Sequence, residues 1–126
     1  MATQEHRAIY ENTIITGYLT HKSANFYTYE NLIENGTIVI EVNNDNEKCL
    51  DLYILKGPEF PTASSFTKKS PSSNTLILEN AEKTLYSITF IANEDCQYSF
   101  QLATSKTSIS RIRKGVFADL LLDEGK

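Results

Sequence analysis

Residues 43–62 read NNDNEKCLDLYILKGPEFPT and contain the pattern that decides the fold. An oxygen-rich loop leads into a short alternating stretch, residues 50–55, which Gly57-Pro58 ends. Apolar residues at every second position are typical of a β-strand with one buried face. This alternation predicts an inner face made of Leu50, Leu52 and Ile54, with Tyr53 on the opposite face.

The same alternation recurs along the rest of the chain. Inner faces of further strands are expected at Tyr27, Tyr29, Ile38, Ile40, Val42, Leu76, Leu78, Tyr86, Ile88, Phe90, Tyr98, Phe100 and Leu102. Turn chemistry separates these stretches at Asn35-Gly36, residues 80–84 and residues 93–95. The chain is therefore predicted to be all-β: an antiparallel, jelly-roll-like β-sandwich of about seven to nine short strands.

Three segments are expected along the chain. Residues 1–11 are mostly polar and predict an N-terminal arm, and residues 12–105 predict the β-sandwich domain. Its first strand, residues 12–19, is expected to contain a glycine kink at Gly17. Residues 106–126 predict a C-terminal linker or strand.

One connection is unusually long. Residues 57–73 are rich in Pro, Ser, Thr and Lys, and a connection of this length is expected to cross from one sheet to the other. Phe60 and Phe66 are expected to hold it against the body of the domain.

The end of the chain allows two interpretations. Residues 14–19 and 112–117 share the pattern Ile-x-x-Gly-x-apolar, which would place the start of a second copy of a tandem array there. The alternative is that so short a pattern recurs by chance. A small basic cluster, expected to be a solvated linker or to contact a neighbouring module, contains Lys106, Arg111, Arg113 and Lys114.

Composition narrows the functional classes. A chain of 126 residues fits one domain, and its net charge of -4 disfavours nucleic acid or an anionic membrane as the main partner. No apolar run approaches the ~18 residues of a membrane helix, and no signal peptide is recognised, which leaves the compartment open. Cys49 and Cys96 either form a disulfide in an oxidising compartment or are both buried thiols.

Five stretches together resemble a known family. They are NFYTY at 25–29, GTIVI at 36–40, DLYILKG at 51–57 with Pro61-Thr62, LYSITF at 85–90 and YSFQL at 98–102. In this order they resemble the bacterial pre-peptidase C-terminal domain, a jelly-roll-like β-sandwich akin to the collagen-binding domains of clostridial collagenases. The resemblance covers about residues 14–104 and is most specific at Asp-Leu-Tyr-apolar-x-x-Gly.

The resemblance implies a non-catalytic module. Members of that family are appended to secreted peptidases and other extracellular proteins, often in tandem, where they help with secretion, targeting or substrate attachment. An extracellular or cell-surface location is therefore expected. Some relatives bind calcium through an acidic loop before the Asp-Leu-Tyr strand. Here Cys49 stands where the first aspartate of that pattern is expected, while Asp51 remains.

Candidate site residues each have an ordinary alternative. Oxygen ligands for calcium are offered by Asn43, Asp45, Glu47 and Asp51, although the same residues suit a solvated hairpin loop. Asn35 lies in an Asn-Gly-Thr glycosylation sequon that a hairpin turn also explains. Tyr53 is a candidate binding surface, and the isolated His6 and His21 are expected to be surface residues.

The leading hypothesis is a non-catalytic β-sandwich module of a larger extracellular or surface protein, acting as a spacer, adhesion or targeting unit. Its partners would be neighbouring domains of the same chain or another protein. The alternatives are a ligand-binding module for calcium, glycan or fibrous protein, and an intracellular structural repeat of a large assembly. No catalytic constellation is recognised, so neither enzymatic activity nor a small-molecule substrate is expected.

Overall fold

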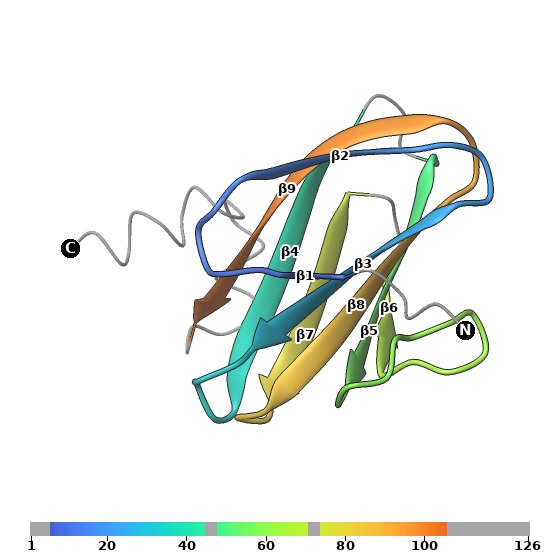
Figure 1. The fold of residues 1–126 in the computed structure, drawn as a ribbon. Coiled ribbons are helices and arrows are strands. Elements are labelled where there is room, and N and C mark those ends of the chain that lie inside the picture. The colour runs from blue at the N-terminus through green and yellow to red at the C-terminus, as the bar shows by residue number, and fades with distance from the viewer. Residues whose placement is uncertain (1–5, 45–47, 71–73, 106–126) are drawn as a thin grey trace.

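The computed structural model of the chain describes residues 6–44, 48–70 and 74–105, and within these ranges it contains nine strands and no helix (Figure 1). Their bounds are β1 (Arg7–Ala8), β2 (Ile15–Leu19), β3 (Ala24–Glu30), β4 (Gly36–Asn44), β5 (Leu50–Lys56), β6 (Lys68–Lys69), β7 (Thr75–Ala81), β8 (Leu85–Ala92) and β9 (Cys96–Ser105). The predicted all-β sandwich is confirmed.

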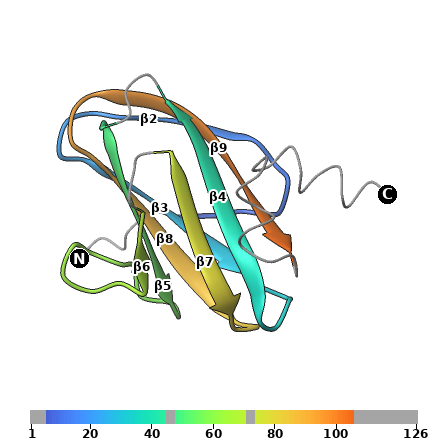
Figure 2. The same cartoon turned by 180° about the vertical axis from the view of Figure 1, so that it is seen from behind.

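Two sheets face each other across the core. One has the strand order β1-β3-β8-β5-β6 and the other β2-β9-β4-β7 (Figures 1 and 2). Strand β1 pairs with β3 in parallel, and every other pair among the described strands is antiparallel. Successive strands alternate between the sheets except at β5 and β6, which are neighbours in one sheet. The fold therefore depends on contacts between segments far apart in the sequence.

The core lies where the period-two pattern places it. Leu50, Leu52 and Ile54 are at most 1% exposed, and every other residue expected on an inner face also belongs to the buried core. Phe90 sits at its centre, with its ring centroid 4.8 Å from that of Phe100 and 5.3 Å from that of Tyr27. Since Phe100 belongs to the opposite sheet, its contact with Phe90 joins the two layers.

The segment expected to be an N-terminal arm contributes to the sandwich. Arg7 and Ala8 form β1 beside β3, and the backbone N–H of Ile9 donates to the carbonyl of Thr28 at 2.8 Å. Ile9 is only 3% exposed, because its side chain fills the core next to this strand pair. The isolated pair Ile9-Tyr10 in a polar segment gave too weak a signal for a strand.

The long connection after β5 adds a strand before it changes sheets. It turns back at residues 62–65, and Lys68–Lys69 then pairs with β5 as β6. The chain next passes to β7 in the other sheet. Phe60 packs on Phe26 and Phe66 on Tyr53, with ring centroids 5.1 and 5.3 Å apart, so both phenylalanines hold the connection against the body of the domain.

Tyrosine hydroxyls form hydrogen bonds within the core. The hydroxyls of Tyr27 and Tyr98 are 2.6 Å apart, and Asn25 Nδ2 donates to the Tyr98 hydroxyl at 2.7 Å. A Cβ atom at Gly17 would lie 2.4 Å from the Tyr98 ring, so only glycine leaves room for that ring. Elsewhere, the Tyr29 hydroxyl donates to Glu11 Oε1 at 2.9 Å.

Burial raises the pKa of three of these phenols. Desolvation is the main cause for Tyr27, Tyr29 and Tyr98; the hydrogen bond to Tyr98 raises the pKa of Tyr27 further, and the bond to Glu11 does the same for Tyr29. Above pH 10 the folded protein keeps these protons, whereas the phenols of the unfolded chain lose them. The unfolded state then binds fewer protons, so stability is lost as the pH rises.

We expect the free energy of unfolding to be independent of these phenols below about pH 9 and to fall above pH 10, by about 1.4 kcal/mol per pH unit for each tyrosine that stays protonated. Urea unfolding at a series of pH values measures this slope. Tyr27→Phe should make the slope shallower, because it removes one phenol whose pKa is raised in the folded protein. An unfolding free energy that stays flat to pH 11.5 would contradict the prediction.

Candidate interaction surface

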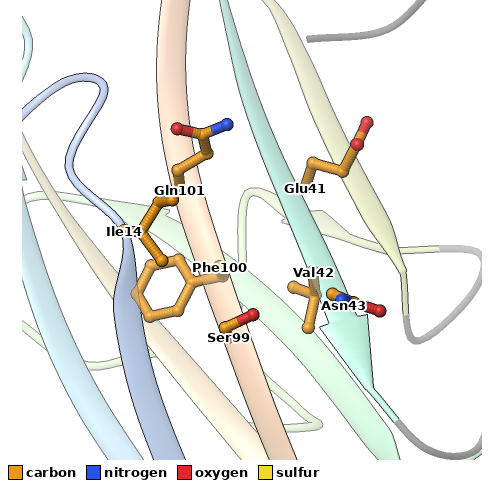
Figure 3. Close-up of a pocket in the computed structure, with 7 residues that line it drawn as sticks. All are labelled: Ile14, Glu41, Val42, Asn43, Ser99, Phe100 and Gln101. Carbon is orange, nitrogen blue, oxygen red and sulfur yellow. The ribbon is translucent and has the colours of Figure 1, made fainter.

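The outer face of the four-stranded sheet carries a ladder of polar side chains. In the register of β2, β9 and β4, Ser99 lies between Thr16 and Asn43. On the next row Gln101 pairs with Glu41, beside Ile14 (Figure 3). These residues point away from the core because their neighbours in the strands, Phe100 and Val42 among them, are buried within it.

Two adjoining open hollows run along this ladder and share Asn43 and Ser99. The first, of about 340 Å³, is lined by Ile14, Glu41, Val42, Asn43, Ser99, Phe100 and Gln101. The second, of about 350 Å³, is lined by Thr16, Asn43, Asn44, Gln97, Tyr98 and Ser99. Neither lining contains a histidine, cysteine or lysine, and Glu41 is the one carboxylate among these residues.

Two large apolar side chains stand exposed next to the hollows. Ile14 is 69% and Tyr18 58% exposed. Tyr18 lies opposite Gln97 on β9. Thr16 lies between Ile14 and Tyr18 in the sequence and belongs to the edge strand β2. A tyrosine presents an apolar ring with a polar tip, and such residues are enriched in protein interfaces. This ladder, together with Ile14 and Tyr18, is called the polar face below.

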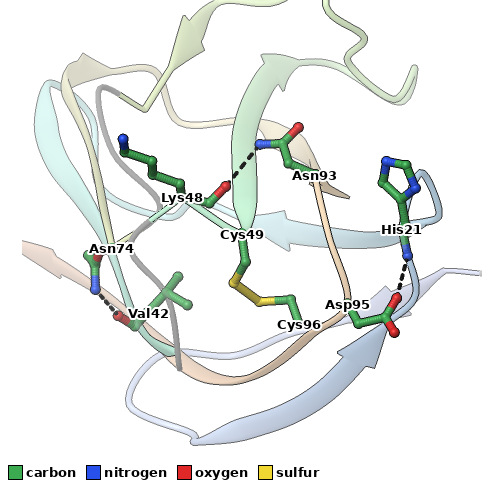
Figure 4. Close-up of a disulfide and its surroundings, with 8 residues drawn as sticks. All are labelled: His21, Val42, Lys48, Cys49, Asn74, Asn93, Asp95 and Cys96. Atoms are coloured by element: carbon green, nitrogen blue, oxygen red, sulfur yellow. Dashed lines mark hydrogen bonds between the residues drawn. A yellow bond between two sulfur atoms is a disulfide. The ribbon is translucent and has the colours of Figure 1, made fainter.

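A disulfide joins Cys49 and Cys96 at one end of the sandwich, with 5.7 Å between their Cα atoms (Figure 4). Cys96 begins β9 and Cys49 directly precedes β5, so the bond links one sheet to the other. Polar side chains around it hold the neighbouring turns: Asn93 Nδ2 donates to the carbonyl of Lys48 at 3.2 Å, and the backbone N–H of His21 donates to Asp95 Oδ1 at 2.9 Å.

The structure does not bring the calcium candidates together as one group. Asp45 and Glu47 lie outside the described residues. Asn43 is on the outer face of β4, whereas Asp51 alternates with buried residues of β5 and therefore faces outward from the opposite sheet. Among the described residues no three His, Cys, Asp or Glu side chains gather as a metal site would need. Calcium binding stays a prediction.

Tyr53 does not lie on an open surface. It is 3% exposed, because Phe66 packs on its ring and Lys69 Nζ lies 5.6 Å from the ring centroid. The sequence shows that Tyr53 is outside the core layer, but the fold-back of the long connection over it required the structure.

The remaining candidates occupy surface turns and loops. Asn35 is exposed, has a φ of 60° and donates its backbone N–H to the carbonyl of Ala81, so it serves the turn before β4; its glycosylation stays a prediction. His6 and His21 are exposed, and the His6 ring lies 5.4 Å from that of Phe60. The described residues contain no helix of the length and apolar character needed to cross a bilayer. The basic cluster and the repeat pattern at 112–117 lie outside the described residues.

Sequence reasoning missed the polar face. Its members are ordinary polar residues of predicted strands, and alternation alone already placed them on a wet side. The alternation of apolar and polar residues does not predict the order of the strands. That order brings Thr16 beside Ser99 and Asn43, which are far from it in the sequence.

We expect removal of the disulfide to destabilise the domain. Its cysteines are 47 residues apart, and in the chain-entropy model a loop of that length contributes about 4 kcal/mol by restricting the unfolded chain. The double variant Cys49→Ala/Cys96→Ala should therefore unfold at clearly lower denaturant concentration than the oxidised protein. The reduced wild-type chain is the matched control and should resemble the variant; equal midpoints for oxidised and reduced protein would contradict the expectation.

No family model matches the chain, and no curated protein matches it. Among solved structures, the chain is similar to PliG of Aeromonas hydrophila, a periplasmic inhibitor of g-type lysozyme (TM-score 0.65, 9% identity, 79% of this chain and 96% of that one). It is also similar to PliG of Salmonella Typhimurium (TM-score 0.51, 14% identity, 80% and 99%). A third similar structure is the pre-peptidase C-terminal domain of collagenase from Bacillus anthracis (TM-score 0.56, 19% identity, 81% and 98%). At these identities the likeness shows the fold: the chain shares its sandwich with a pre-peptidase C-terminal domain and with periplasmic lysozyme inhibitors.

Proposed function

We propose that this protein is a non-catalytic module that binds another protein through its polar face, outside the reducing cytoplasm. The observation that carries the proposal is the exposure of Ile14 and Tyr18 at 69% and 58% beside the polar ladder of β9 and β4. Apolar side chains next to polar ones are the composition of a protein-binding patch.

The shape of the polar face favours a macromolecular partner over a small molecule. A small ligand is usually enclosed on most of its surface by a cleft, whereas these hollows are shallow and lie on the flat outer side of a sheet. Side chains on paired strands are held in place by the backbone ladder, so little ordering is needed when a partner binds.

The similar structures support the same class of function. PliG is a lysozyme inhibitor, so a sandwich of this fold can present a surface to a protein partner. The collagenase structure is one domain of a larger protein, which supports a module within a longer chain. The disulfide supports a periplasmic or extracellular location rather than an intracellular repeat, since such bonds persist in oxidising compartments. A tandem second copy stays a prediction, tested by the sequence that follows Lys126.

A photo-reactive amino acid at position 18 should give a discrete adduct with one secreted or periplasmic protein of the source cells. The control position is Glu59, which is exposed in the connection after β5 that lies over the other sheet. The same photo-reactive amino acid at position 59 is not expected to give this adduct. Mass spectrometry identifies the partner, which is then purified.

Tyr18→Ala should weaken binding of the purified partner by at least tenfold, because removal of a buried interface tyrosine commonly costs more than about 1.4 kcal/mol. The control Leu32→Ala truncates a side chain that is 70% exposed in the turn between β3 and β4 and should leave the affinity unchanged. Adducts that are the same at positions 18 and 59, or equal affinities for the two variants, would reject the polar face as the binding site.

A further inference from the structure

A polar cavity lies between the two sheets along one side of the sandwich. That side is bounded by β1 and β3 at the edge of the five-stranded sheet and by β2 at the edge of the four-stranded sheet. The cavity has a volume of about 250 Å³. Its lining includes residues of all three strands: Arg7 of β1, Thr16 and Gly17 of β2, and Asn25 and Tyr27 of β3. We call this cavity the edge cleft.

The strand register directs side chains from the edge of the five-stranded sheet into the cleft. Arg7 pairs in register with Tyr27, and such partners on neighbouring strands point to the same face of a sheet. Since Tyr27 belongs to the core, the Arg7 side chain is on the core side of its sheet, at the edge. Asn25 is two residues before Tyr27 and shares that face. On the β2 side, a side chain at Gly17 would clash with the Tyr98 ring, so the cleft wall is bare backbone there.

The floor of the cleft has one hydrogen-bond donor more than it has acceptors in use. Asn25 Nδ2 donates to the Tyr98 hydroxyl, and that hydroxyl is 2.6 Å from the Tyr27 hydroxyl. Each phenol carries one hydrogen, and the bond between the two phenols uses only one of them. With the Asn25 amide oriented in this way, the second phenolic hydrogen has no acceptor among the residues that the structure describes. When Tyr98 donates to Tyr27, that hydrogen belongs to Tyr27, which lines the cleft.

Arg7 adds a positive charge beside this donor. It forms no ion pair with any residue in the described ranges. Its guanidinium is close enough to affect the Tyr27 hydroxyl: burial and the bond to Tyr98 raise the pKa of Tyr27, and the charge of Arg7 acts in the opposite direction. The described lining of the cleft contains no aspartate or glutamate. A guanidinium presents its N–H donors as a planar fork that matches the two oxygens of a carboxylate, so the cleft suits an anionic group of that shape.

We propose that the edge cleft is a binding site for a carboxylate group, held by the Arg7 guanidinium and the Tyr27 hydroxyl. A cavity of about 250 Å³ is smaller than the usual pocket for a drug-sized ligand, so it takes a small group. Two sources supply a carboxylate of that size: the terminus of a polypeptide chain and a free small acid. The inference does not depend on the proposed function, although Thr16 lines both the edge cleft and a hollow of the polar face.

Nuclear magnetic resonance titration of the isotope-labelled, disulfide-intact full chain tests the proposal. N-acetylglycine, which ends in a carboxylate, should shift the amide resonances of Gly17 and Asn25 in a saturable way. N-acetylglycinamide has the same shape without the charge and should leave them in place. Tighter binding of N-acetylglycine than of acetate would assign the site to chain termini, and equal or tighter binding of acetate would assign it to free small acids.

Variants identify the groups that hold the carboxylate. Arg7→Gln should weaken N-acetylglycine binding at least tenfold, because it removes the charge and the fork of donors. The matched control Lys83→Gln makes the same change of charge at an exposed residue in the turn between β7 and β8 and should leave the affinity unchanged. Tyr27→Phe should weaken binding about threefold. If Tyr27→Phe does not fold, Arg7→Lys, which keeps the charge but loses the fork, is expected to show the same loss.

The proposal fails if N-acetylglycinamide shifts the same resonances as N-acetylglycine, or if N-acetylglycine gives no saturable shift. It also fails if Arg7→Gln binds N-acetylglycine as tightly as the wild-type chain does. Tyr18→Ala, which tests the polar face, should leave the affinity for N-acetylglycine unchanged. Either proposal can therefore be rejected while the other holds.

Discussion

The packing of Phe90 against Phe100 is the contact on which the rest of the structure depends. These rings come from different sheets and lie 4.8 Å apart, and Tyr27 and Tyr98 complete the aromatic group around Phe90. Because side chains alternate along a strand, fixing these rings inside also fixes which residues of β9 face outward. A register slip of one residue would bury Ser99 and expose Phe100. The core therefore specifies the polar face.

The disulfide and the tyrosine hydroxyl bonds complement this apolar contact. At one end of the sandwich, Cys49 and Cys96 form a covalent link between the sheets. Within the core, the hydroxyls of Tyr27 and Tyr98 satisfy each other, which lets a large polar side chain lie deep between the sheets.

The period-two pattern was sufficient to predict the fold class and the inner faces, since Leu52, Phe90 and Phe100 lie in the core and alternate with residues on the other side of their strands. It could not predict β1, because the isolated pair Ile9-Tyr10 has no periodic context, nor the covering of Tyr53, because that depends on where a long connection folds back. The period-two pattern could not predict the polar face for a different reason. Thr16, Ser99 and Asn43 become neighbours only through the order of the strands in the sheet. Which residues become neighbours on the outer face depends on the tertiary arrangement of the strands. Which residues face the core follows from the local sequence pattern.

The two-residue strands β1 and β6 have a consequence for how the molecule meets other chains. They form both edges of the five-stranded sheet, and β6 consists of Lys68 and Lys69. Very short edges give an incoming strand few backbone groups to pair with, and the lysines of β6 add charge there, so both features protect against open-ended sheet growth. The four-stranded sheet ends instead in β2 and β7, of five and seven residues. Among the described strands, a peptide that added itself to this sandwich would find a full-length edge on that sheet, beside Tyr18 on one side and beside Glu79 on the other.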